Sequence, residues 1–295
     1  MPIIHDFQYF KPRNLGEALQ RLAEFEGRCR VLAGGTDLVC WLRDELVTPE
    51  ALVDLKGLPE LDRLDLAGDV LSIGARVTFT DLLDSPLIAE RFPVLAEMAA
   101  GVASMAIRNR ATVVGNLCSA VACCDAGPVL LALGAQMVVA GPEGEGRIPL
   151  SDWFLGNRRT ALAPGQLVVR VEVPDPGRHG ACYLKLGRYQ GQDLCQVGVA
   201  LVAQPGNVWH AAFGSVASRP FRCLDLEHLL SSGPLTAELL AQAKALALQE
   251  VAPITDIRAS KEYRLLMVGV MLERGVKATA ARLAGQGPAY GMSLT

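Results

Sequence analysis

The sequence has little excess charge and no long apolar run, and each shortage excludes a class of protein. Lys and Arg total 28 against 31 Asp and Glu, so the net charge is −3 and the surface is not suited to attract nucleic acid or anionic lipid. The longest nearly uncharged stretch, residues 126–141, contains Pro128 and Gly134 and is shorter than the ~18 apolar residues that a membrane-spanning helix requires. We therefore expect no nucleic acid and no membrane among the partners.

Signals for secretion and for metal binding are also missing. The first residues lack a basic segment followed by an apolar stretch, so we expect a cytoplasmic protein. The eight cysteines include no Cys-x-x-Cys pair and no matching Cys/His doublets, so neither a zinc site nor an iron–sulfur cluster is predicted. Cys118, Cys123 and Cys124 form the only local cluster, and we expect most of the thiols to be free and buried.

With 295 residues, 51% of them hydrophobic, the chain can bury a large core and form two or three domains. Asn14 followed by Glu17 is a capping signal for a helix over residues 15–25. Short strands are predicted at 30–33, 51–54, 70–73 and 136–140, helices at 38–46, from 78 and at 92–103, and a strand or extended loop at 107–116.

Residues 174–177 read Pro-Asp-Pro-Gly, which stops any regular element and predicts a domain border. Beyond it, residues 182–188, 196–203 and 208–216 are predicted to form antiparallel strands, because their connections are short. Two helices follow, at 236–250 and from Ser260. The second carries a stripe that we interpret as core, and residues 284–295 are predicted to be a frayed tail; the stripe consists of Tyr263, Leu266, Met267, Val270 and Met271.

Two glycine-containing segments point to a phosphate-bearing ligand. Residues 31–38 read Val-Leu-Ala-Gly-Gly-Thr-Asp-Leu, and residues 112–116 read Thr-Val-Val-Gly-Asn. Glycine lets the backbone approach a ligand and aim its N–H groups at an anion. Neither segment contains Lys or Arg, so amide dipoles and side-chain hydroxyls would have to neutralise the phosphate. Either segment taken alone is more often an ordinary tight turn.

These segments and several others resemble the FAD-binding subunit of molybdenum-containing hydroxylases, such as xanthine dehydrogenase and carbon monoxide dehydrogenase. The likeness covers nearly the whole chain and its motifs occur in the expected order. They are Ala33-Gly-Gly-Thr-Asp-Leu38, Ile107-Arg-Asn109, Thr112-Val-Val-Gly-Asn116 with Leu117-Cys118, Asp125, Leu162-Ala-Pro-Gly-Gln-Leu-Val168, Lys185 with Asp193, and Arg258-Ala-Ser-Lys-Glu-Tyr-Arg264.

The resemblance implies a set of FAD-binding residues. The first pyrophosphate loop would comprise Arg30, Val31, Leu32, Ala33, Gly34, Gly35, Thr36 and Asp37, and the second Thr112, Val113, Val114, Gly115 and Asn116. Ile107, Asp125, Val168 and Lys185 would complete the set, with Asp125 accepting from cofactor hydroxyls and Lys185 near the flavin. Two alternatives remain open: Asp125 could cap a helix beginning near Pro128, and Lys185 could be a solvated strand residue.

The resemblance also implies an α+β fold. A two-part FAD-binding domain of the PCMH type would occupy residues 1–56, a small βαβ lobe, and 57–176, a larger lobe. A C-terminal domain of antiparallel sheet and helices, of the carbon monoxide dehydrogenase flavoprotein type, would occupy 177–285, with 286–295 as the tail. The implied function is electron transfer within a heteromeric complex: [2Fe-2S] clusters on one partner subunit would deliver electrons from molybdopterin on another, and FAD would pass them to NAD or another acceptor.

The sequence departs from the family pattern at the second loop. Val114 replaces the first of two adjacent glycines, and a β-branched residue resists positive φ, so this loop either keeps an ordinary φ there or binds more loosely. The segment 119–124 is also richer in cysteine than its family counterpart. These departures keep open a non-catalytic assembly subunit with weakened FAD binding. A stand-alone flavin oxidoreductase is the other alternative, although no acid/base pair or Ser/His/Asp arrangement is evident.

Overall fold

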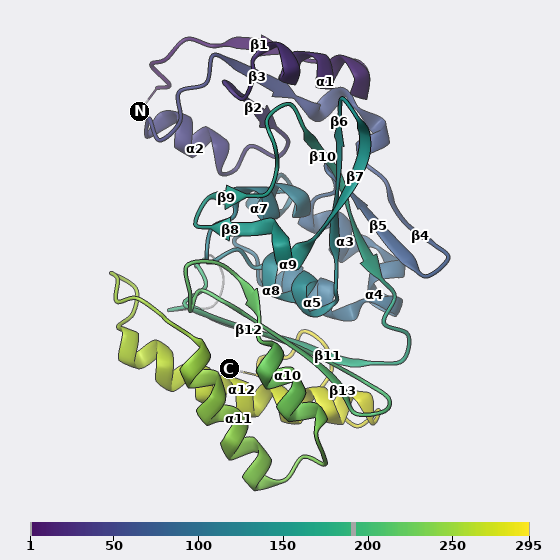
Figure 1. Cartoon of the computed structure of the whole chain (residues 1–295), viewed down its shortest axis with the longest axis vertical. Helices are drawn as coiled ribbons and strands as arrows, with labels where there is room; N and C mark the ends of the chain where they lie inside the picture. The colour runs from purple at the N-terminus through teal and green to yellow at the C-terminus, as the bar shows by residue number, and fades with distance from the viewer. Residues whose placement is uncertain (1, 190–192, 295) are drawn as a thin grey trace.

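The computed structural model describes residues 2–189 and 193–294 and shows three layers along the long axis (Figure 1). The first layer is a small three-stranded parallel sheet in the order β1-β3-β2 with two helices. Asn14 caps its first helix by accepting from the Glu17 N–H. Its elements are β1 (Gln8–Phe10), α1 (Leu15–Glu24), β2 (Cys29–Leu32), α2 (Leu38–Arg43) and β3 (Ala51–Asp54), followed by the 3₁₀ turns η1 (Leu55–Gly57) and η2 (Pro59–Leu61).

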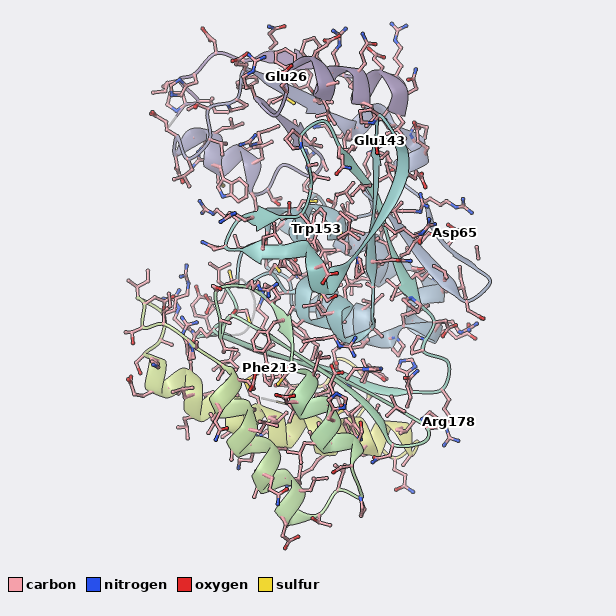
Figure 2. All side chains as sticks on the ribbon, in the orientation of Figure 1. Glu26, Asp65, Glu143, Trp153, Arg178 and Phe213 are labelled. Atoms are coloured by element: carbon pink, nitrogen blue, oxygen red, sulfur yellow. The ribbon has the colours of Figure 1, made fainter. Side chains whose placement is uncertain are left out.

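The second layer is a five-stranded antiparallel sheet, in the order β4-β5-β10-β6-β7, packed against short helices. Its strands are β4 (Leu64–Ala67), β5 (Val70–Gly74), β6 (Gln136–Gly141), β7 (Gly144–Pro149) and β10 (Leu167–Pro174), with a small hairpin of β8 (Phe154–Gly156) and β9 (Arg159–Thr160). Its helices are α3 (Phe79–Asp84), α4 (Pro86–Arg91), α5 (Pro93–Ala100), α6 (Met105–Arg108), α7 (Val113–Ser119), α8 (Ala126–Ala132) and α9 (Leu150–Trp153). Trp153, labelled in the middle of Figure 2, is fully buried and donates from its indole N–H to the Leu117 carbonyl at 3.0 Å.

The third layer is a four-stranded antiparallel sheet, in the order β11-β12-β13-β14, with three helices. Its elements are β11 (Gly180–Leu186), β12 (Val197–Gln204), β13 (Val208–Gly214), β14 (Phe221–Arg222), α10 (Leu224–Ser231), α11 (Ala237–Glu250) and α12 (Lys261–Leu283). Side chains alternate along a strand, so successive residues of β11 face two different cores. Cys182 and Leu184 pack toward the helices, as does Phe213 of β13, which is labelled in Figure 2. Ala181 and Tyr183 join the core of the preceding layers. The third sheet is therefore a wall shared by two cores.

The expectation of a strand or extended loop at 107–116 is wrong. Residues 105–108 and 113–119 form the helices α6 and α7, and the side chains of Ser104 and Thr112 cap them. An isolated β-bridge between Thr78 and Thr112 is the only β pairing of that segment within the described part of the chain. The residues predicted as a second turn are thus the first turn of a helix.

Two expectations about the C-terminal region are also wrong, the first only in part. The core stripe on α12 is confirmed for Met271, which is fully buried, and for Met267, which packs against the core. Tyr263 and Leu266, however, are 44% and 64% exposed, and Arg264, Val268 and Leu272 are buried instead. Residues 284–294 are not frayed either. The Tyr290 hydroxyl accepts from the Ala181 N–H at 3.2 Å, and the Gly291 N–H donates to Glu97 Oε1 at 3.1 Å.

Across residues 2–189 and 193–294, the helices are all too short or too polar to span a lipid bilayer. All eight cysteines are free, and five of them are buried: Cys29, Cys124, Cys182, Cys195 and Cys223. The expectation that most thiols are free and buried is therefore confirmed.

Candidate functional site

A cavity of about 800 Å³ lies where the first two layers and the start of the third meet. This volume is in the range of cavities that hold a large organic ligand. The segment after β2, the first turn of α7, the segment before α8 and residues 162–168 all contribute to its wall, as do Arg188 and Arg258 from the C-terminal region. One cavity thus collects both glycine-containing segments that the sequence singled out.

The first segment presents free amide groups to the cavity. Within the part of the chain that the structure describes, the backbone N–H groups of Gly34, Gly35, Thr36 and Asp37 donate to no backbone acceptor. Gly35 has a φ of +79°, a conformation that favours glycine. Thr36 lines the same wall and carries a hydroxyl donor. This row of unpaired donors suits an anionic ligand, because orphan amides cost free energy unless something accepts from them.

Gly34 lets the two segments touch through their backbones. A Cβ atom added at this position would lie 2.0 Å from the Arg110 carbonyl oxygen and 3.0 Å from the Cα of Ala111. Any side chain would therefore force apart the segment after β2 and the segment that leads into α7. The absence of a side chain at Gly34 sets the width of this end of the cavity.

The second segment is fixed by its own cap and by a neighbouring strand end. The Thr112 hydroxyl accepts from the Gly115 N–H at 3.0 Å, and the Val113 N–H donates to the Val77 carbonyl at 3.0 Å. Val114 is helical and 3% exposed, so it takes an ordinary φ, as one of the two expectations for this position required. Asn116 turns its side-chain oxygen to the Ala126 N–H at 3.1 Å, which ties α7 to the start of α8.

Asp125 is the buried carboxylate of the cavity wall. It is 7% exposed and stands at the N-cap position of α8, yet its side chain makes no capping hydrogen bond, so the helix-cap alternative is wrong. Its Oδ1 accepts from the Tyr183 hydroxyl at 2.7 Å, and its Oδ2 accepts from Lys185 Nζ at 2.9 Å. Lys185 also donates to the Gly101 carbonyl at 2.9 Å and its side chain is 13% exposed, so it is not a solvated strand residue.

Two opposing effects act on the pKa of the Asp125 carboxyl group. Burial raises the pKa of Asp125, and the adjacent Lys185 ammonium and the two hydrogen bonds act in the opposite direction. Burial likewise raises the pKa of Tyr183 well above 10, so its hydroxyl stays protonated and remains a donor. Asp125 and Lys185 form a buried ion pair, and the neutral Tyr183 hydroxyl donates to the same carboxylate. Removal of any one of the three side chains would leave a buried polar group without its partner.

Three thiols line the cavity beside this carboxylate: Cys118, Cys123 and Cys124. Burial raises the pKa of all three, that of Cys118 to about 12, so at neutral pH they are uncharged thiols and poor nucleophiles or metal ligands. Within the described ranges, no group of three His, Cys, Asp or Glu side chains is placed to hold a metal ion. The thiols therefore act as small apolar wall residues.

Most of the residues predicted for the site line this one cavity. The exceptions are Leu32, whose side chain packs behind Gly35, Val113, which is fully buried in the core, and Lys185, which lies behind Asp125. Those that line it are Arg30, Val31, Ala33, Gly34, Gly35, Thr36, Asp37, Ile107, Thr112, Val114, Gly115, Asn116, Asp125 and Val168.

The prediction missed several wall residues. Trp41 of α2 lines the cavity and lies under Arg158, whose guanidinium carbon is 5.0 Å from the ring centroid. Arg188 and Arg258 reach the cavity from the C-terminal region, and each pairs with a nearby aspartate, Asp193 and Asp256. The family motif containing Arg258 was a usable signal, whereas no local pattern marks Trp41 or Arg188.

Comparison with known proteins matches both parts of the chain. The family model described as "FAD binding domain in molybdopterin dehydrogenase" matches residues 5–176, and the model described as "CO dehydrogenase flavoprotein C-terminal domain" matches residues 182–279. The chain is 32% identical over 280 residues to the carbon monoxide dehydrogenase medium chain of Afipia carboxidovorans, covering 94% of this chain and 97% of the relative. It is 30% identical over 285 residues to a putative xanthine dehydrogenase FAD-binding subunit of Escherichia coli, covering 94% and 97%.

Solved structures agree with these matches. The chain superposes with a TM-score of 0.91 and 31% identity on a chain of carbon monoxide dehydrogenase from Hydrogenophaga pseudoflava, covering 96% of this chain and 99% of that one. A chain of quinoline 2-oxidoreductase from Pseudomonas putida 86 gives a TM-score of 0.89 at 30% identity, covering 96% and 99%. The predicted α+β fold is therefore confirmed, and the protein belongs to the family of FAD-binding subunits of molybdenum-containing hydroxylases.

Proposed function

We propose that this chain collects electrons from the [2Fe-2S] clusters of a partner subunit on FAD bound in the 800 Å³ cavity and passes them to NAD or another acceptor. In this proposal a further subunit carries molybdopterin and oxidises the substrate, and the assembly works in the cytoplasm. The observation that carries the proposal is the row of unpaired amides at residues 34–37 facing the capped first turn of α7 across a backbone contact.

The donors present fit the diphosphate of FAD. A diphosphate needs many hydrogen-bond donors, and this end of the cavity offers the free amides of Gly34 to Asp37 together with the Thr36 hydroxyl and the Asn116 amide nitrogen. Backbone amides are held rigidly by the contact between Gly34 and Arg110, so little entropy is lost when a ligand binds. The Thr112 oxygen accepts from the Gly115 N–H, and its own O–H remains free to donate to a phosphate oxygen.

Other residues of the chain orient the ligand and exclude water. Asp125 keeps acceptor capacity for a cofactor hydroxyl, because its two hydrogen bonds leave lone pairs free. Val168, Ile107 and Val114 give the cavity apolar walls. Lys185 places a positive charge behind Asp125. FAD, when bound, supplies the chemistry: it accepts electrons one at a time and releases two of them as hydride.

The carbon monoxide dehydrogenase and xanthine dehydrogenase relatives are named as a medium chain and an FAD-binding subunit, which supports a role within a larger complex. We propose domain divisions at 57 and 177, so that the FAD would lie between the two N-terminal lobes. The molybdenum-site substrate would then contact another subunit and not this chain.

The test uses the full chain purified alone and with its neighbouring gene products. The proposal predicts flavin absorption at close to one FAD per chain and co-purification with two subunits that contain molybdenum and iron. Reduction of the complex by its substrate should then be followed by NADH formation when NAD⁺ is added. A chain that stays colourless with excess FAD would instead support the non-catalytic assembly role, and substrate turnover by the isolated chain would support the stand-alone enzyme.

A further inference from the structure

Tyr183 joins the C-terminal sheet to the cavity wall through two carboxylates. It lies on β11, an edge strand of its sheet, and is 7% exposed. Its backbone N–H donates to Glu97 Oε2 at 2.9 Å, and its hydroxyl donates to Asp125 Oδ1 at 2.7 Å. Glu97 belongs to α5 and Asp125 precedes α8, so one residue fixes the relative positions of three elements.

The direction of the Asp125 carboxylate is set by β11 and not by its own helix. Asp125 makes no side-chain capping hydrogen bond to α8, and the first N–H of that helix, on Ala126, donates to Asn116 Oδ1. Tyr183 and Lys185 point to the same side of β11, because side chains two apart on a strand share a face. Each holds one oxygen of the carboxylate, so the group has a single orientation in the cavity wall.

The two partners of Asp125 differ in what they contribute. Lys185 supplies charge, and it divides its hydrogen bonds between Asp125 and the Gly101 carbonyl. Tyr183 supplies direction through one short hydrogen bond from a rigid ring that is packed in the core. Tyr183 is not among the described residues that line the cavity, so any effect on a ligand must pass through Asp125.

We propose that Tyr183 is a positioning residue of the FAD site, whose hydroxyl holds the Asp125 carboxylate in the orientation that accepts a hydrogen bond from a hydroxyl of FAD. The inference rests on the proposed function, because it needs FAD in this cavity. Loss of the Tyr183 hydroxyl frees Asp125 Oδ1 to rotate and to seek another donor, so the acceptor presented to the ligand is no longer fixed.

Removal of this donor also changes the ionisation of Asp125. Burial already raises its pKa, and the Tyr183 hydrogen bond is one of the interactions that oppose this rise. Without it the pKa rises further, so at acid pH more of the carboxyl is protonated and is a weaker acceptor. The titratable and charged groups that face Asp125 and its partners are Lys185 and Tyr183 of β11, Cys123 and Cys124 before α8, Cys195 before β12, and Arg258 beyond Cys123.

The experiment measures the dissociation constant of FAD from the full chain at pH 6 and pH 8 for Tyr183→Phe and Tyr290→Phe. The Tyr183 hydrogen bond is present with and without FAD, so only the loss of a fixed acceptor for the cofactor hydroxyl affects binding. Tyr183→Phe should therefore weaken FAD binding by roughly 5- to 10-fold, and more at pH 6 than at pH 8. Tyr290→Phe is the matched control. It removes a hydroxyl that accepts from the Ala181 N–H on the same strand, but it leaves Asp125 untouched, so affinity should stay within about twofold of wild type.

If Tyr183→Phe and Tyr290→Phe weaken FAD binding equally, and by the same factor at pH 6 and at pH 8, the two tyrosines merely anchor β11 and the proposal is overturned. Wild-type affinity in Tyr183→Phe would overturn it as well. Because the phenylalanine variant leaves a buried carboxylate oxygen unpaired and endangers folding, 3-fluorotyrosine at position 183 is the second variant. This phenol keeps both the shape and the donor, so FAD affinity should stay near that of wild type, and a loss as large as that expected of Tyr183→Phe would contradict the inference. A wild-type chain that binds no FAD would instead refute the proposed function itself.

Discussion

Replacement of Gly34 by alanine should open the anion-binding end of the cavity. The new methyl group would lie 2.0 Å from the Arg110 carbonyl oxygen, so the two backbones must separate by roughly 1 Å before contact becomes tolerable. Overpacking of this kind costs about 1–3 kcal/mol. If that cost falls on the bound state, in which the free amides at residues 34–37 must converge on one ligand, the dissociation constant for FAD rises by roughly 5- to 150-fold.

The assay is a titration of flavin-free protein with FAD, followed by flavin fluorescence, with a thermal melt of each protein alongside. Gly233→Ala is the control, because a Cβ at that position meets nothing within 4 Å and its φ lies outside the left-handed region. We expect the control to bind FAD as wild type does. Should Gly34→Ala also bind FAD with wild-type affinity at an unchanged melting temperature, the backbone contact would not set the geometry of the site, and the reasoning would fail.

Three further predictions concern stability and reactivity. Salt bridging to Arg222 and further hydrogen bonds lower the pKa of the buried Glu227 from 4.5 to about 2. The ionised form therefore stabilises the fold by about 3 kcal/mol above pH 4.5, and this stabilisation is lost as the pH falls toward 2. Glu227→Gln should flatten that part of the pH profile of urea unfolding, and an unchanged slope would contradict the prediction. Cys40 is the one exposed cysteine of the eight, so it should react quickly with iodoacetamide in the native protein, whereas the denatured protein should react at all eight thiols. If mass spectrometry detects rapid modification of Cys123 in the native protein, the role given to the cavity thiols is refuted. Deletion of residues 286–295 removes the Tyr290 ring that lies over Arg282 and the hydrogen bond from Gly291 to Glu97, so the melting temperature should fall by several degrees. A truncated chain with an unchanged melting temperature would show that these contacts are dispensable.

Elements with local signals were predictable from the sequence. The helices after Asn14, Thr236 and Ser260 begin where a side-chain cap is available, and the structure places an N-cap hydrogen bond at each. The strands of the C-terminal sheet follow from apolar runs joined by short connections. The segments near residues 34 and 115 were identifiable because they occur in order with the other motifs of the family, whereas either segment alone is compatible with an ordinary turn.

Features that depend on distant contacts were not predictable. The run of β-branched residues at 112–114 has a strand preference, yet a Thr112 cap and the pairing with Val77 make it helical. Arg264 is 4% exposed because it binds the Gln196 and Ser215 carbonyls and Asp256, which no periodicity on α12 can foresee. The pair formed by Asp125 and Lys185 joins residues 60 positions apart in the sequence.

The residues after α12 close the structure behind the cavity wall. Arg282 is almost fully buried and donates to Glu97 from its two terminal guanidinium nitrogens, and Tyr290 and Gly291 lie over the same place. Glu97 in turn holds the backbone of β11, the strand behind Asp125. Because Glu97 and Arg282 lie 185 positions apart in the sequence, the wall of the ligand chamber is complete only after this distant segment has docked against α5.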